Sequence, residues 1–330
     1  MSAMTKTFRL VLRRVIGIVL WLALFAEVLV FNPRTLENRP PLVPRHDGVR
    51  DKAEQEMEGV YLVEIGENSR QWELWANEAV GIRGTGDWFL KDVKAQFFGK
   101  DQVSYIVEGE DGTVNSETKN MEIRGNIRMT SSNGYIFLSD RLVFHHVEKT
   151  IVSPGPVKMK SDPKVQPGKF ELSGSRMKSW MDSNLIHVVG NVKSTREIDE
   201  TRSVYITSDE AFLSATDRSS RFKDNVKIDS GTSHIEGPEA EFRFDKPSGE
   251  VSSLVVTGGA KLKDADRFAE SDTAIMLLKE DRYVLRGNPR LTRGGDLLVG
   301  EEIVFSRNGR QIQVFGVKGK FMAPKSGDKK

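Results

Sequence analysis

The sequence predicts an all-β protein, an elongated stack of antiparallel strands preceded by one N-terminal transmembrane helix. Two observations predict the stack. A short phrase built around Gly-Asn recurs along the chain, and apolar and polar residues alternate from about Tyr61 onward. A third observation, an apolar run near the N-terminus, predicts the helix.

The apolar run from Val15 to Phe31 predicts a membrane anchor. A helix of this length spans about 25 Å, close to the hydrocarbon thickness of a bilayer. Basic residues dominate the charge of residues 1–14, so this segment stays in the cytoplasm and the rest of the chain is exported. A cleaved signal peptide is the alternative. Cleavage after Ala26 would place Leu24 at the −3 position, where an A-x-A cleavage site has a small residue.

Glu27 is the charged residue within this anchor. It either reaches water at the outer interface or contacts a protein partner inside the membrane. Residues 32–58 follow, and they are proline-rich, polar and without periodicity. We expect them to form an extended tether that leads to the next domain.

The recurring phrase is Gly-Asn or a close relative, followed by an apolar, a basic and an apolar residue. Its copies begin roughly 30 to 35 residues apart, a period typical of repeat architectures. We expect each copy to form a tight turn that starts a strand. The copies are Gly125–Met129, Gly190–Lys193 and Asp224–Ile228, with looser versions at Gly155–Met159, Gly259–Leu262 and Gly287–Leu291.

Alternation is clearest in Ala240–Asp245, where the apolar residues share one face and the charged residues share the other. Strands with a single apolar face favour a thin body with one inner face over a deeply buried, round core. Residues 161–168 and 195–203 are weak polar seams, but the repeats run across both. We therefore expect one continuous β stack with a junction near residue 197.

Composition and motifs argue against several functions. The net charge of +2 leaves no nucleic-acid footprint, and without cysteine the chain has no disulfide or thiolate site. His145 and His146 are neighbours on a predicted strand and face opposite ways, so they do not chelate one ion. Gly84–Asp87 lacks the Lys-Ser/Thr of a phosphate loop. We expect a non-enzyme with no cofactor, no metal site and no nucleic-acid partner.

Two sets of short motifs follow the predicted anchor. The first set is Trp72–Ala76, Phe97–Phe98, Asp111–Gly112, Gly125–Ile127, Asn133–Gly134 and Leu142–Phe144. The second set is Asn225–Ile228, Ala240–Phe244, Tyr283–Pro289 and Gly300–Ile303. The anchor and the first set, in this order, resemble LptC, the membrane-anchored periplasmic component of lipopolysaccharide transport. The second set resembles LptA and the OstA-type domains that share its fold. The resemblance implies one jellyroll at residues 59–196, a second at 197–322 and a disordered tail at 323–330.

The resemblance also implies a fold and a function. The fold is an open β-jellyroll, two antiparallel sheets in a V, whose apolar trough binds the acyl chains of lipopolysaccharide. The implied partners are an inner-membrane ABC transporter permease and LptA-like or outer-membrane LptD-like jellyrolls. The chain is then a single-pass inner-membrane protein with most of its residues in the periplasm. A trough suits this role because each methylene exposed to water costs about 0.8 kcal/mol.

The sequence names candidate residues for each contact. For the partner edge we expect the C-terminal strand with Ile312, Val314 and Val317, and Lys149–Val152 also suits an edge ladder. Glu27 is the candidate partner contact within the membrane. The alternative role of the trough candidates is to fill a closed core between the sheets. These candidates are Phe144, Ile228, Phe242, Phe244, Leu285 and Phe305.

Two other functions fit the same repeats. One is a β-helical enzyme or adhesin that acts on polysaccharide, because solenoids have similar periods. The other is a membrane-tethered structural scaffold with a filled core and only protein partners. Parallel coils would identify the first, and the absence of lipid at the inner face would identify the second.

Overall fold

The structure is a computed structural model. All the residues that it describes belong to one unit of the chain, Val49–Lys330. The predicted anchor at residues 15–31, with Glu27, and the predicted tail at 323–330 lie outside the described residues. Within the described part, no helix is long and apolar enough to cross a membrane. The described segments are 53–66, 69–99, 103–165, 169–197, 203–245, 250–280, 282–306 and 311–317.

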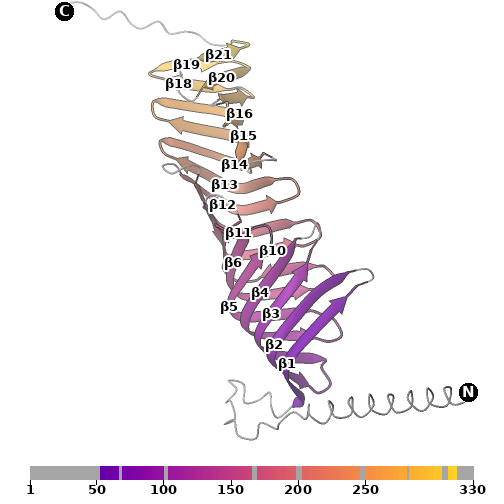
Figure 1. Ribbon diagram of the computed structural model, residues 1–330. Coiled ribbons are helices and arrows are strands. Elements are labelled where there is room, and N and C mark those ends of the chain that lie inside the picture. Colours follow the sequence, from indigo (N-terminus) through magenta and orange to yellow (C-terminus); the bar gives the residue numbers. More distant parts are fainter. Residues whose placement is uncertain are drawn as a thin grey trace, which may run out of the picture. The chain divides into compact units, whose positions relative to one another are not determined.

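The described residues form 21 β-strands, which confirms the all-β prediction. Most strands pair with their neighbours in sequence, and the chain runs from indigo to yellow through the sheet in Figure 1. The first strand begins at Ala53, inside residues 32–58, so the predicted tether extends too far toward the C-terminus. The strands are β1 Ala53–Ile65, β2 Arg70–Ile82, β3 Asp87–Phe98, β4 Ser104–Asn115, β5 Met121–Ser131, β6 Tyr135–His145, β7 Thr150–Ser153, β8 Val157–Ser161, β9 Phe170–Gly174, β10 Arg176–Trp180, β11 Leu185–Glu197, β12 Ser203–Ser214, β13 Ser219–Ser230, β14 Ser233–Phe244, β15 Val251–Asp264, β16 Arg267–Leu277, β17 Arg282–Arg286, β18 Arg290–Arg293, β19 Asp296–Val299, β20 Glu302–Ser306 and β21 Ile312–Phe315. The exceptions to pairing in sequence order are β6 with β8, β7 with β10, β9 with β11, β16 with β18 and β17 with β20.

Every strand pair among the described residues is antiparallel. This contradicts the alternative of a β-helix, whose coils are parallel. Strand β11 pairs with β12 from Leu185 opposite Ser214 to Glu197 opposite Ser203. The sheet is therefore continuous across the expected junction near residue 197.

Many of the long strands carry a one-residue register shift near their middle. In β13, for example, the ladder to β14 shifts between Lys223 and Val226. The recurring phrase occupies these positions, and Gly125-Asn126, Gly190-Asn191 and Asp224-Asn225 all have positive φ. Such a shift is a β-bulge, which bends a strand and increases its twist. At Gly125, Gly190, Asp224 and Gly259 the phrase therefore marks a bend within a strand, and there the prediction of a turn that starts a strand was wrong. The looser copies at Gly155 and Gly287 do precede new strands, β8 and β18.

Backbone conformation and side-chain amides explain why Gly and Asn recur at the bends. Gly adopts positive φ without strain, and Asn is among the few other residues that do so readily. The Asn225 side chain also donates a hydrogen bond of 2.6 Å from Nδ2 to Oδ2 of Asp209 on β12. Asn126 donates in the same way to Glu110 on β4. Each of these bends is thereby tied to the preceding strand.

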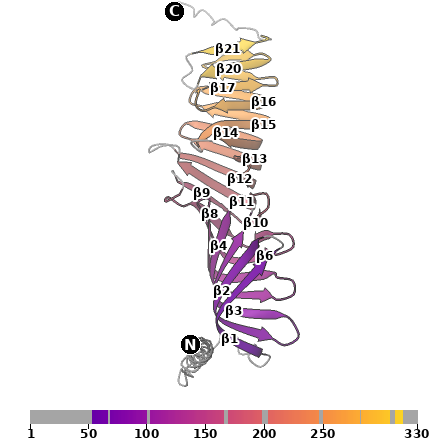
Figure 2. The same cartoon turned by 45° about the vertical axis from the view of Figure 1, so that its right-hand side comes forward.

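The bends divide the sheet into two walls, whose apolar faces form one core cluster. Wall A contains β7, β10, β17, β20 and β21, and wall B contains β8, β9, β18 and β19. The long strands β1–β6 and β11–β16 run through both walls. The curvature of these strands is visible in Figure 2. The arrangement is consistent with a β-jellyroll.

Two glycines near the bends differ in the space available for an added methyl group, and this difference tests the packing. A Cβ at Gly174, beside the bend between β9 and β10, would lie 2.3 Å from Cγ1 of Val188. A Cβ at Gly155, between β7 and β8, would meet nothing within 4 Å. We expect Gly174→Ala to lower the free energy of unfolding by about 1–3 kcal/mol through overpacking, and Gly155→Ala to change it little. Urea denaturation of the two variants measures this, and equal midpoints would contradict the bend geometry.

Candidate functional site: cavities between the walls

The six predicted trough residues all belong to the interior between the walls. Phe144, Ile228, Phe242, Leu285 and Phe305 are buried members of the core cluster. Phe244 is partly buried and packs against that cluster. Their location leaves open two roles, lining a cavity or filling the core, and the six residues divide between them.

Three of these residues lie in tightly packed parts of the interior. The ring of Phe144 packs on Phe97 with a centroid distance of 4.5 Å. Phe305 stacks on Tyr283 with centroids 5.0 Å apart, and Leu285 is 1 % exposed. None of the three lines the cavities described below. Their packing places them in the interior away from these cavities.

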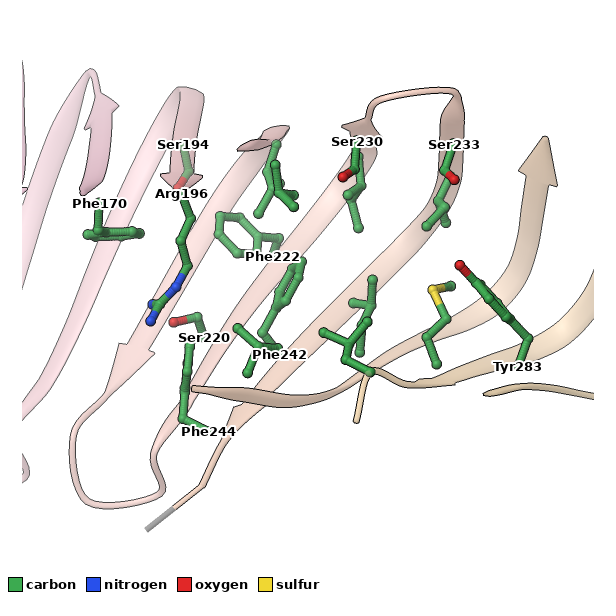
Figure 3. A pocket seen from close by; sticks show the side chains of 18 residues that line it. Phe170, Ser194, Arg196, Ser220, Phe222, Ser230, Ser233, Phe242, Phe244 and Tyr283 are labelled. Atoms are coloured by element: carbon green, nitrogen blue, oxygen red, sulfur yellow. The ribbon is translucent and has the colours of Figure 1, made fainter. Parts of the chain in front are cut away.

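The other three line a cavity of about 160 Å³ between the walls, here called the central cavity. Ile228 contributes from wall B, and Phe242 and Phe244 from wall A, so the cavity lies between facing walls (Figure 3). An apolar cavity of about 150 Å³ is large enough to hold a small hydrocarbon such as benzene. The remaining lining residues are Phe170, Ser194, Arg196, Val204, Ile206, Ser220, Phe222, Ser230, Ser233, Ile235, Val251, Leu254, Met276, Leu278 and Tyr283.

One cationic side chain enters this apolar lining. Figure 3 shows Arg196 projecting from β11 toward Ser220 and Phe244. Its guanidinium carbon lies 4.7 Å from the centroid of the Phe244 ring, a cation–π contact. Burial lowers the pKa of the Arg196 guanidinium, and the electrostatic influence of Tyr135 opposes this shift. The charged group is thus held partly out of water at the cavity wall.

A second cavity of about 360 Å³, here called the junction cavity, adjoins the first. The two share Phe170, Arg196, Ser220 and Phe244 in their linings. Its lining is more polar and includes Tyr135, whose hydroxyl pKa is raised by burial. The other lining residues are Tyr105, Asn133, Met159, Asn184, Ile186, Leu213, Ser214, Ala215, Arg218, Ser219 and Asp245.

A third cavity of about 220 Å³ lies among β1–β4. Trp72, Trp88 and Leu90 are among its lining residues. The interior of the described unit therefore alternates between packed stretches and cavities.

The predicted edge residues lie at the last described strand. Strand β21 pairs with β20 and with no other described strand. Ile312 and Val314 point toward the core and pack against it, while Val317 follows the strand and is exposed. Lys149–Val152, the other candidate edge, is not one, because β7 pairs with both β6 and β10. At the opposite end β1 pairs only with β2 among the described strands.

Two histidines in the described residues, His187 and His234, lie beside carboxylates. The Nε2 atom of His187 lies 2.9 Å from Oε2 of Glu210. His234 contacts Asp229 and Glu236, and hydrogen bonds to these two carboxylates raise its pKa. No group of three or more His, Cys, Asp or Glu side chains within the described segments is placed to hold a metal ion.

Sequence reasoning missed Arg196 and Ser194. Arg196 lies within residues 195–203, for which the sequence predicts a polar seam, and Ser194 lies just before them. Val192 is buried, and alternation from it places Ser194 and Arg196 on the same inner face. That alternation was the available signal.

Truncating aromatic residues distinguishes core from lining. Phe144→Ala removes a buried ring from a packed stretch, and we expect a loss of about 3–5 kcal/mol in the free energy of unfolding. Phe244→Ala removes a partly buried ring beside existing cavities, so its cost should be less than half as large. Denaturant unfolding of both variants provides the comparison. A larger loss at Phe244 would show that the central cavity is not a stable feature of the interior.

Two family models match successive parts of this chain. Residues 66–197 match the family described as lipopolysaccharide-assembly, LptC-related. Residues 205–310 match the family described as LptA/(LptD N-terminal domain) LPS transport protein. These matches confirm the expected resemblance, to LptC in the first part and to LptA in the second.

Among solved structures, the chain is similar to LptH from Pseudomonas aeruginosa, described as the LptA homologous periplasmic component of the conserved lipopolysaccharide transport device. The identity is 17 %, the TM-score is 0.33, and the alignment covers 39 % of this chain and 94 % of that one. No curated protein matches this chain.

Proposed function

We propose that this chain, which combines an LptC-related domain with an LptA/LptD N-terminal-type domain, is a membrane-anchored periplasmic component of the lipopolysaccharide transport bridge. One observation carries the proposal: the two matched regions succeed each other on one antiparallel sheet. The ladder between β11 and β12 joins residue 197 to residue 203. A single interior can therefore serve both regions.

The interior between the walls is the proposed path for acyl chains. The jellyroll is open in this proposal, and the walls part on the side opposite the bends. Acyl chains then occupy the central cavity first. They enter the packed stretches on either side of it when the walls part there. Each shielded methylene saves about 0.8 kcal/mol relative to water. No covalent step is needed, and the protein acts as a carrier and not as an enzyme.

The proposed partner edges are β1 at one end of the sheet and β21, the edge of wall A, at the other. Strands β1 and β21 each pair with one described neighbour, so each can add a strand from another jellyroll. We assign β21 to an LptA-like or LptD-like partner toward the outer membrane. The segment at residues 15–31, with Glu27, is assigned to the inner membrane beside an ABC transporter permease, which supplies the energy. The bulk of the chain then lies in the periplasm.

Lipid binding should depend on the inner face of β14. Phe242 is buried at the central cavity, and Arg243, the next residue, is exposed and paired with Glu241. We expect Phe242→Asp to weaken lipopolysaccharide binding by about tenfold or more, since a buried Phe contributes about 1.5–3 kcal/mol. Arg243→Asp should have little effect. Binding of purified lipopolysaccharide to the full chain measures both.

If Phe242→Asp fails to fold, a photoreactive amino acid at positions 242 and 243 provides a second test. Position 242 should capture lipopolysaccharide in cells, and position 243 should not. Equal capture at both positions, or none at either, would favour the scaffold with a filled core.

The edge assignment is tested separately. A photocrosslinker at Val314 on β21 should capture a second jellyroll protein in cells. Tyr205 is the control, because it is exposed on β12, a strand with neighbours on both sides. Capture at Tyr205 but not at Val314 would contradict the assignment.

A further inference from the structure

We propose that the central and junction cavities together form a binding site for an anionic amphiphile, with its acyl chain in the central cavity and its phosphate or carboxylate at Arg196. The inference deepens the proposed function and rests on it. It adds a particular place in the interior where the ligand's charge, and not only its hydrocarbon, is recognised.

One cavity is apolar and the other is more polar, which matches the apolar tail and the polar head of an amphiphile. The central cavity is lined mainly by aliphatic and aromatic side chains, such as Ile206, Phe222 and Leu254. The junction cavity adds amide, hydroxyl and guanidinium groups, among them Asn133 and Arg218. Because Arg196 belongs to both linings, an anion beside it has an apolar space on one side and a polar space on the other.

The charges of the linings favour an anion. Among the described residues, the lining of the central cavity includes Arg196 and no carboxylate. The described lining of the junction cavity includes Arg196, Arg218 and one carboxylate, Asp245. A guanidinium binds carboxylate or phosphate through two parallel hydrogen bonds, and such charge-assisted bonds are stronger in a partly dehydrated site. The cation–π contact with Phe244 holds the guanidinium at this wall.

A second polar group points to a ligand. Ser194 lies two residues before Arg196 on β11, is 4 % exposed and lines the central cavity. Its Oγ is buried without a hydrogen-bond partner among the described residues. An unsatisfied buried hydroxyl costs about 1–3 kcal/mol. An oxygen of a ligand head or ester group near Arg196 would supply the missing partner.

The test uses the full chain in a membrane mimetic and two photoreactive probes with the same dodecyl chain. One probe carries a phosphate head and the other a neutral glucoside head. Labelling of peptides from β9, β11 and β14, read by mass spectrometry against probe concentration, gives the half-saturation of each probe. We expect the phosphate probe to saturate at lower concentration than the glucoside.

Variants then assign the preference to its residue. Arg196→Gln should raise the half-saturation of the phosphate probe by about tenfold or more, the range of a lost charge-assisted hydrogen bond, and should leave the glucoside unchanged. Arg243→Gln, on the outer face of β14, is the matched control and should change neither. If Arg196→Gln does not fold, Arg196→Lys replaces it. Lysine keeps the positive charge but cannot form two parallel hydrogen bonds, so this variant should raise the half-saturation of the phosphate probe less than tenfold and leave that of the glucoside unchanged.

The remaining outcomes separate the two proposals. If both probes label the cavities equally and Arg196→Gln changes neither, the anion site is overturned while the proposed function stands. If neither probe labels the cavities, both proposals fail. Inorganic phosphate at millimolar concentration should not displace the phosphate probe. If it does, with the same dependence on Arg196, the site binds a free anion and the assignment to an amphiphile is wrong.

Discussion

The structure depends on a bend in the middle of its strands. At four of the six copies of the repeat, residues with positive φ, such as Gly125-Asn126 or Gly190-Asn191, lie at a β-bulge. The bend lets one strand contribute to both walls, so neighbouring strands with aligned bends produce two facing walls without separate sheets. The apolar alternation on each side of the bend then points into the same interior. The cavities, and any ligand they hold, exist because of this alignment.

The sequence was sufficient for the fold class and the repeat, because alternation and period are local properties. It was insufficient for the role of the repeat, since Gly-Asn is equally typical of a hairpin turn and of a bulge. The distinguishing contact is remote. Asn126 bonds to Glu110 and Asn225 to Asp209, each partner lying 16 residues earlier on the neighbouring strand. Only the strand register brings these side chains together.

The same limit applies to the interior. Alternation predicted which face of each strand is apolar, but it could not separate residues that fill the core from residues that line a cavity. Phe144 is core because Phe97, on a strand that is not its sequence neighbour, packs against it. Phe242 and Phe244 line a cavity because no side chain of the described residues fills the space before them. The charge of Arg196 is typical of a polar seam, although its place in the alternation of β11 puts it on the inner face.

A carrier of apolar chains benefits from this mixture of packed and open stretches. Where the walls pack on each other, an incoming acyl chain exchanges wall–wall contacts for wall–lipid contacts, and the buried apolar area changes little. Such an exchange has a shallow energy profile, which permits movement but gives no preferred position. A cation in the apolar lining changes this, because it distinguishes the head of a lipid from its tail. Arg196, at the wall shared by two cavities near the boundary of the two matched regions, is placed to give the path one such position.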